Sequence, residues 1–167
     1  MSPTATSAEP RRQIAIERRF RATPDAIWEL WTTKDGIESW WGPPGFSVKV
    51  RSLDLRTGGQ LDYTMSASTP ETVAFMNRAG MPVTTEHLVT YTDVVPLRRL
   101  AWMHPVDFVP GVPTYDTASA LELREDGDGV RLVLTIDAMH DDVWTQRAVM
   151  GWQGELGKLA AVLGEAP

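Results

Sequence analysis

The C-terminal stretch from His140 to Leu163 constrains the fold more than any other part of the sequence. Placed on a 3.6-residue period, eight of its residues, nearly all apolar, fall on one stripe, which predicts a single long amphipathic helix. The stripe consists of Thr145, Ala148, Val149, Trp152, Leu156, Leu159, Ala160 and Leu163. Arg147, Gly154 and Lys158 fall opposite it. A helix of this kind needs an apolar surface to pack against.

The ends of this predicted helix carry the residue types that helix ends favour. Asp141 and Asp142 can cap the positive N-terminal end, and Gly164 stands where a glycine commonly follows the last turn. The glycines inside the helix argue the other way, because each costs about 1 kcal/mol relative to alanine. We therefore expect packing, and not intrinsic propensity, to hold the helix in place.

Most of the chain before this helix alternates apolar and polar residues, as strands do. The alternating segments are 13–21, 46–55, 60–66, 83–94, 100–108, 115–125 and 129–139. Two short helical patterns follow the first of them, the second beginning after a break at Gly36. Successive hairpins predict an α+β fold in which a curved antiparallel sheet of about six to seven strands wraps around the C-terminal helix.

Three local signals refine the predicted sheet. The inward parity of the second alternating segment shifts near Arg51 and Ser52, which predicts a β-bulge. Gly58 and Gly59 predict a tight two-residue hairpin turn. Pro105 has no N–H to donate, so we expect it to interrupt the hydrogen-bond ladder of its strand.

The remaining segments set the domain boundaries. Residues 1–12 are small, polar and proline-containing, and we expect them to form a disordered leader to a single domain at 13–164. Residues 68–82 interrupt the hairpins with a Thr-Pro-Glu helix start and a glycine stop, which predicts a helical insertion. We interpret this insertion as a candidate lid over a pocket, with a surface excursion as the alternative.

Composition excludes several classes of function. The sequence contains no cysteine, which excludes disulfides and thiolate zinc sites. It has no apolar run of the length that a signal peptide or a membrane span needs, so we expect a cytoplasmic protein without membrane insertion. The net charge is −6 with both signs interspersed, which argues against nucleic acid as a partner.

No catalytic or metal-binding motif stands out. His87, His104 and His140 follow no metal-ligand spacing, and the sequence has no nucleophile elbow, phosphate loop or dinucleotide fingerprint. We therefore expect no catalytic residue, no metal and no cofactor. For each histidine, a structural role is favoured over acid–base chemistry.

An ordered set of motifs runs through the predicted elements. The set comprises Phe20 to Thr32 (FRATPDAIWELWT), Trp40-Trp41-Gly-Pro, Asp54-Leu-Arg-Thr-Gly-Gly, and Gly151-Trp152 with Leu156 and Leu159. In order and spacing these motifs resemble the START-like or SRPBCC superfamily, and within it the C-terminal domain of the activator of the heat-shock-protein-90 ATPase. The resemblance extends over residues 13–163. It implies a helix-grip fold with a cavity between sheet and helix that often takes apolar ligands.

The resemblance and the aromatic content together give a functional hypothesis. The sequence has seven tryptophans, and tryptophan serves both cores and ligand pockets. We expect a small apolar or aromatic molecule to bind in the cavity between sheet and helix. The residues expected to line it are Trp31, Trp41, Phe46, Tyr63, Met65, Tyr91, Trp102, His104, Tyr115, Val149 and Trp152. A cavity smaller than about 300 Å³ would count against this hypothesis.

Arg18 is a further candidate, because it falls on the apolar side of the first predicted strand. A guanidinium in an apolar cavity needs a carboxylate or an anionic ligand, and snorkelling to the sheet edge is the alternative. Two other functions stay open. One is a cyclase- or aromatase-like enzyme with His104 or a tyrosine beside an inward carboxylate, and the other is a co-chaperone-like contact with a heat-shock-protein-90 homologue. Homodimer formation is likewise open.

Overall fold

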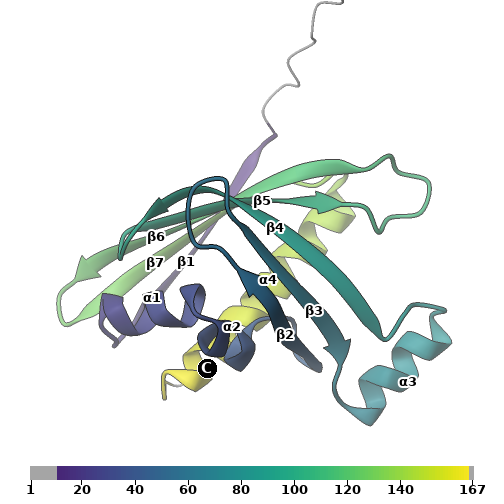
Figure 1. The fold of residues 1–167 in the computed structure, drawn as a ribbon, viewed down its shortest axis with the longest axis horizontal. Coiled ribbons are helices and arrows are strands. Elements are labelled where there is room, and N and C mark those ends of the chain that lie inside the picture. The colour runs from purple at the N-terminus through teal and green to yellow at the C-terminus, as the bar shows by residue number, and fades with distance from the viewer. Residues whose placement is uncertain (1–10, 166–167) are drawn as a thin grey trace, which may run out of the picture.

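One curved sheet lies across one long helix in the computed structural model, which describes residues 11–165 (Figure 1). Within these residues, seven antiparallel strands form the sheet in the order β1-β7-β6-β5-β4-β3-β2. The strands are β1 Gln13–Phe20, β2 Phe46–Leu53, β3 Gln60–Ala67, β4 Thr84–Val95, β5 Arg99–Val106, β6 Tyr115–Asp126 and β7 Gly129–Asp137. The helices are α1 Pro24–Thr32, α2 Lys34–Trp40, α3 Pro70–Arg78 and α4 Asp142–Val162. The predicted α+β helix-grip fold is confirmed.

The long C-terminal helix, α4, has the caps and the buried stripe that its sequence predicts. Asp141 is the N-cap, and its carboxylate accepts a hydrogen bond from the Trp144 N–H at 2.8 Å. Gly164 follows the helix with a φ of 77°, a conformation that glycine adopts without steric penalty. Leu156 and Leu159 are fully buried. In Figure 1, α4 runs beneath the sheet and its C-terminal end lies beside α1 and α2.

The side of α4 opposite the stripe also contacts the rest of the fold. The Lys158 ammonium donates to the backbone carbonyls of Gly42 at 3.0 Å and Phe46 at 3.3 Å. A Cβ added to Gly154 would lie 3.1 Å from the ring of Pro44, so helix and loop approach closely there. These contacts fasten the loop between α2 and β2 to the helix.

Two of the predicted local breaks lie elsewhere than expected. Gly36 is buried inside α2, and the break between α1 and α2 lies three residues earlier, at Thr33. The Thr33 hydroxyl caps α2 by accepting a hydrogen bond from the Gly36 N–H at 3.0 Å. The predicted two-glycine hairpin is also wrong. Gly58 and Gly59 exchange backbone hydrogen bonds with Tyr91 of β4, and the connection extends over residues 54–59. The predicted bulge is present, since the register of β2 on β3 shifts between Val50 and Ser52.

The sheet splits between β4 and β5. Their pairing ends at Thr90 and Met103, beyond which residues 84–89 pair with β3 and residues 104–106 pair with β6. Pro105 lies on the β5 side of the split and has no N–H with which to continue the ladder towards β4. Figure 1 shows the two strands diverging, β4 towards α3 and β5 towards the β5–β6 loop.

Tryptophans fill the space between the sheet, α1, α2 and the middle of α4. The Trp31 ring centroid lies 4.6 Å from that of Trp40, 5.3 Å from Trp41, 5.8 Å from Trp102 and 6.0 Å from Trp152. Aromatic pairs at such separations each add about 0.5–1.5 kcal/mol beyond the burial of their area. We call these five residues the tryptophan cluster, and they form the centre of the core.

The predicted helical insertion lies at the periphery. Residues 68–82 contain α3, which projects from the end of β3 and β4 (Figure 1) and exposes Phe75 and Met81 by 58% and 49%. Most of the predicted leader, residues 1–10, lies outside the described part of the chain. Arg12 precedes β1, and its carbonyl accepts a hydrogen bond from the Ala138 N–H at 2.7 Å. None of the described helices combines the length and apolarity that a membrane span requires.

Candidate functional site

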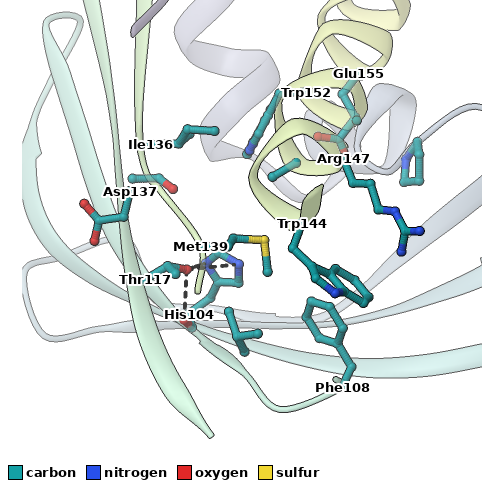
Figure 2. Close-up of a pocket in the computed structure, with 15 residues that line it drawn as sticks. His104, Phe108, Thr117, Ile136, Asp137, Met139, Trp144, Arg147, Trp152 and Glu155 are labelled. Atoms are coloured by element: carbon teal, nitrogen blue, oxygen red, sulfur yellow. Dashed lines mark hydrogen bonds between the residues drawn. The ribbon is translucent and has the colours of Figure 1, made fainter. Parts of the chain in front are cut away.

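A cavity of about 280 Å³ lies between α4 and the strands β5, β6 and β7 (Figure 2). It is lined by Pro43, His104, Val106, Phe108, Thr117, Ser119, Ile136, Asp137, Met139, Trp144, Arg147, Ala148, Gly151, Trp152 and Glu155. This volume is just under the roughly 300 Å³ at which typical small-molecule sites begin. It corresponds to the liquid volume of about nine water molecules. By the limit set from the sequence, this size counts against the predicted small-molecule site, and most of all against a sterol or a long acyl chain. The remaining space accommodates one ring with a short substituent.

Helical periodicity builds the wall that α4 contributes. Trp144, Ala148, Gly151, Trp152 and Glu155 follow one another at intervals close to three or four residues, so they share one side of the helix. A Cβ added to Gly151 would meet nothing within 4 Å. The glycine that weakens the helix interior therefore leaves open space in the middle of the cavity wall.

The exposed lining residues gather near the N-terminal end of α4. Phe108, on the β5–β6 loop, is 51% exposed, and its ring centroid lies 5.9 Å from that of Trp144. The Arg147 guanidinium carbon lies 4.9 Å from the centre of the Trp144 ring. Figure 2 shows Phe108 and Trp144 side by side, with Arg147 extending away from the interior. Within the described chain, no residue of 68–82 lines the cavity, so the β5–β6 loop and the start of α4 form its entrance.

His104 and Thr117 supply neutral hydrogen-bonding groups on the strand side. Thr117 Oγ1 lies 3.1 Å from His104 Nδ1, and Thr117 is buried. Burial lowers the pKa of His104, and the positive charge that His87 can carry acts in the same direction. The imidazole is therefore neutral near pH 7 and offers one donor and one acceptor.

Glu155 is the carboxyl group on the helical wall. It is half-buried, and Figure 2 shows its carboxylate turned inward, in contrast to the Arg147 guanidinium. Burial raises the pKa of Glu155 to about 7, against the opposing influence of the Lys158 charge and the Gly42 N–H. Among the described residues, no cation lies within ion-pair distance of Glu155, because Lys158 donates to backbone carbonyls instead. The cavity thus contains a titratable acid without a side-chain partner.

Asp137 is the second carboxyl group of the lining, and its role is different. Its carboxylate accepts a hydrogen bond from the Ala118 N–H at 2.9 Å and points away from the centre of the cavity in Figure 2. This contact joins the ends of β6 and β7. Residues 11–165 contain no cluster of three or more His, Asp or Glu side chains arranged to hold a metal ion.

A second pocket, of about 240 Å³, occupies the split between β4 and β5. His104 lines both pockets, whereas His87 lines only this one and stacks on Tyr63 at a centroid distance of 5.0 Å. Burial lowers the pKa of His87. The remaining lining is mostly polar and comprises Arg51, Asp62, Glu86, Leu88, Val89, Pro105 and Asp107.

The structure brings two of the residues predicted from the sequence, His104 and Trp152, into the lining of the cavity between α4 and β5–β7. Several others are core residues instead. Trp31, Trp41, Trp102, Tyr63 and Tyr91 are buried, the three tryptophans in the tryptophan cluster and the tyrosines on β3 and β4. Phe46 and Met65 are half-buried on the paired ends of β2 and β3.

The last three candidates lie outside the cavity. The Tyr115 hydroxyl lies 2.7 Å from His140 Nδ1, close to the start of α4. Val149 lines a separate groove between β1 and α4. Arg18 is half-buried on β1, with its guanidinium carbon 5.8 Å from the centre of the Phe20 ring.

Sequence reasoning missed Glu155, although the sequence contained a signal for it. Glu155 follows Trp152 by three residues and precedes Leu159 by four, and both of these belong to the predicted stripe. A charged residue at such a position faces the packed side of the helix. Phe108 shares the parity of Trp102 and His104 in the alternating segment 100–108, a signal that was not used, whereas Met139 is off the inward parity of segment 129–139. In the structure both residues lie in connections.

Comparisons with known proteins agree with this architecture. The protein family described as Activator of Hsp90 ATPase homolog 1-like protein matches residues 21–164. A comparison with curated proteins finds no match. Protein CV1439 from Chromobacterium violaceum superposes with a TM-score of 0.72 at 22% identity, over 92% of this chain and 98% of that one.

Two further solved structures show the same fold. The AHSA1 (SPO3351) protein from Silicibacter pomeroyi gives a TM-score of 0.70 at 22% identity, over 92% of this chain and 98% of that one. CalU16 from Micromonospora echinospora gives a TM-score of 0.61 at 23% identity, over 92% of this chain and 82% of that one. The family match extends over most of the sequence and all of the elements from α1 to α4. This chain therefore belongs to the Activator of Hsp90 ATPase homolog 1-like family.

Proposed function

We propose that this protein binds a small molecule with an aromatic or compact apolar body in the cavity between α4 and β5–β7. The observation that carries the proposal is the composition of the lining. Apolar side chains such as Ile136, Met139 and Trp152 form most of the wall, and a few polar groups, among them His104 and Glu155, stand at separate points. Small-molecule sites generally have this composition, with apolar area for affinity and polar groups for orientation.

A cavity-filling variant tests the proposal. A leucine at Gly151 can extend into the cavity, because the space beside this residue is open. Gly157 offers a matched control on the same helix, since a Cβ there also meets nothing within 4 Å and the residue does not line the cavity. Thermal unfolding of the wild type, Gly151→Leu and Gly157→Leu is measured with a panel of one-ring aromatic compounds.

The proposal predicts a saturable stabilisation of the wild type by one chemical class. A ligand that binds only the folded state stabilises it by about 2.7 kcal/mol at 100 times its dissociation constant. Gly157→Leu should keep this response and Gly151→Leu should lose it. A wild type that responds to no compound, or a Gly151→Leu variant that responds fully, would refute binding in this cavity.

One observation favours a second candidate function, a contact with a heat-shock-protein-90 homologue. Phe75 and Met81 expose apolar surface around α3, on the outside of the fold. Exposed apolar patches commonly mark protein interaction sites. The ATPase rate of a heat-shock-protein-90 homologue, measured with the wild type and with Phe75→Ser, tests this candidate. A rate that changes with the wild type and not with the variant would support it.

The geometry does not favour the cyclase-like alternative. That function requires His104 or a tyrosine beside an inward carboxylate. Among the described residues, the Tyr115 hydroxyl pairs with His140, the Tyr91 hydroxyl has no partner, and no hydrogen bond joins a tyrosine hydroxyl to a carboxylate. In the described structure, the hydrogen-bonding partner of the imidazole is Thr117, and no carboxylate is bonded to it.

A further inference from the structure

We propose that the molecule held in the cavity carries a protonated amine and that Glu155 is the group that pairs with it. This inference rests on the proposed function, because it concerns the same cavity. It assigns a ligand-binding role to a residue that the sequence pattern did not single out. It also narrows the ligand class to small aryl- or alkylamines.

The first support is that the Glu155 carboxylate has no side-chain partner. Its carboxylate lies at an otherwise apolar wall, and no side chain of the described structure forms an ion pair with it. Lys158, one turn further along α4, donates to the carbonyls of Gly42 and Phe46. A carboxylate that is removed from water without a partner is costly, so an incoming cation recovers interaction energy that the protein itself leaves unused.

The second support is the aromatic surface next to this carboxylate. Trp152 precedes Glu155 by three residues, so the two side chains leave α4 on the same side. Aromatic faces attract ammonium groups, most strongly where water is excluded. A carboxylate beside an indole ring is therefore suited to an ammonium group attached to an apolar body.

The other charges around the cavity do not oppose this assignment. Arg147 lies eight residues before Glu155 on α4, which separates them by about 12 Å along the helix axis. Its side chain is exposed and extends outward over Trp144. On β5, His104 is neutral near pH 7 for the reason given above. On β7, the Asp137 carboxylate is bonded to the Ala118 N–H.

Two further elements face the same end of α4. On β3, burial raises the pKa of Tyr63, and the negative charge of Glu155 adds to the rise, so this phenol stays neutral. On α2, the Glu38 carboxylate accepts a hydrogen bond from the Val50 N–H at 3.0 Å. The interior near Glu155 thus holds one acid without a side-chain partner, on which only the Gly42 N–H and the Lys158 charge act favourably, and within the described structure no cation apart from Lys158.

The raised pKa of Glu155 gives amine binding a distinctive pH dependence. A primary alkylamine stays protonated from pH 6 to pH 8, whereas a carboxyl group with a pKa of about 7 goes from mostly neutral to mostly ionised. Amine affinity should therefore rise about tenfold over this range, and binding should release about half a proton at pH 7. A ligand that accepts a hydrogen bond from the neutral acid would show the opposite trend.

Three probes with the same ring test the inference. They are 2-phenylethylamine, 2-phenylethanol and 3-phenylpropionate, which differ in carrying a cation, a neutral hydroxyl or an anion. Calorimetric titrations at pH 6, 7 and 8, in two buffers of different ionisation enthalpy, give affinity and proton release. The methyl NMR signal of Met139, a lining residue, shows whether each probe enters the cavity. We expect the amine to bind at least tenfold more tightly than the other two at pH 8.

Glu155→Gln keeps the shape of the side chain and removes its charge. This variant should lose the amine preference and the pH dependence, while the affinity for 2-phenylethanol stays within twofold. Asp142→Asn is the matched control, because it removes a charge from the same helix at a side chain that is 95% exposed. It should bind as the wild type does. Thermal unfolding without ligand confirms that both variants fold.

Four results would overturn the inference. Equal binding of the three probes, or amine binding that survives Glu155→Gln, would show that Glu155 does not pair with the ligand. Either result leaves the proposed function intact. Amine binding that does not shift the Met139 signal places the amine outside the cavity. If no probe binds at all, and the wider panel also fails against the wild type, the proposed function fails together with the inference.

Discussion

At the scale of single residues, Glu155 makes the stability of the folded protein depend on pH. Its pKa is raised from an ordinary 4.5 to about 7, so the folded state holds a proton that the unfolded state releases. This contribution is fully present below pH 4.5 and is lost as the pH rises through 7, up to about 3 kcal/mol in all. The buried histidines act in the opposite sense, because folding lowers their pKa.

The Glu155→Gln variant separates the effect of Glu155 on stability from that of the histidines. The free energy of unfolding, measured by urea titration from pH 5 to pH 8, should fall with rising pH for the wild type relative to Glu155→Gln. The difference between the two proteins isolates Glu155, because both contain the same histidines. A difference that stays constant over the whole range would show that the folded pKa of Glu155 is close to its ordinary value.

Tyr91 gives a second prediction at this scale. Its hydroxyl is buried without a hydrogen-bonding partner among the described residues, which carries a penalty of about 1–3 kcal/mol. Tyr91→Phe keeps the ring and removes the unpaired group, so it should leave stability unchanged or raise it by about 1 kcal/mol. Chemical denaturation measures this. A loss of more than 1 kcal/mol would mean that the hydroxyl makes a favourable contact.

The residue scale also shows what the sequence can and cannot predict about the site. His104 and Trp152 were found, because strand parity and helix period place both on the packed side of their elements. Trp31, Trp41 and Trp102 were assigned to the cavity as well, yet they pack against one another. Periodicity tells which side of an element a residue faces, and it does not tell whether that side meets a neighbour or a void.

At the scale of elements, two glycines in helices should respond to alanine in opposite ways. Gly151 has open space beside it, so Gly151→Ala should stabilise α4 by about 0.5–1 kcal/mol through helix propensity. Gly36 lies in the first turn of α2, against the last turn of α1. A Cβ there would overlap the Glu29 carbonyl and lie 2.8 Å from the Leu30 Cα, so Gly36→Ala should destabilise the protein.

Thermal unfolding of the two alanine variants measures both effects. The midpoint should rise for Gly151→Ala and fall for Gly36→Ala, relative to the wild type. Equal changes in the two variants would mean that local propensity, and not the contact between α1 and α2, decides the outcome. The sequence predicted a break at Gly36 because glycine is a common helix breaker. The structure shows that its missing side chain serves close packing instead.

Long elements were predictable and connections were not, for a physical reason. A strand or helix repeats its pattern over several residues, so α4 and β7 are each determined by many side chains at once. The split between β4 and β5 depends on one residue, Pro105, together with the path of a loop. The entrance of the cavity, at Phe108, is a consequence of that path.

At the scale of the whole molecule, α4 connects two regions with different tasks. The tryptophan cluster surrounds the middle of the helix, and the cavity adjoins its first half, with Trp152 belonging to both. A domain of this size normally unfolds in one cooperative step. Damage to the cluster should therefore lower the stability of the entire fold, whereas damage to the cavity wall should change ligand binding with a much smaller effect on stability.

Trp31→Ala and Gly151→Leu test this division together. Trp31 is 1% exposed and central to the cluster, so its truncation should cost about 3–5 kcal/mol, with a single unfolding transition by both fluorescence and circular dichroism. The remaining folded fraction should bind a cavity ligand with nearly the wild-type affinity, because the Trp31 side chain does not line the cavity. Gly151→Leu should abolish ligand binding and change the stability of the fold much less. If Trp31→Ala abolished binding while the protein stayed folded, the cluster would have to be part of the ligand site, as the sequence alone had suggested.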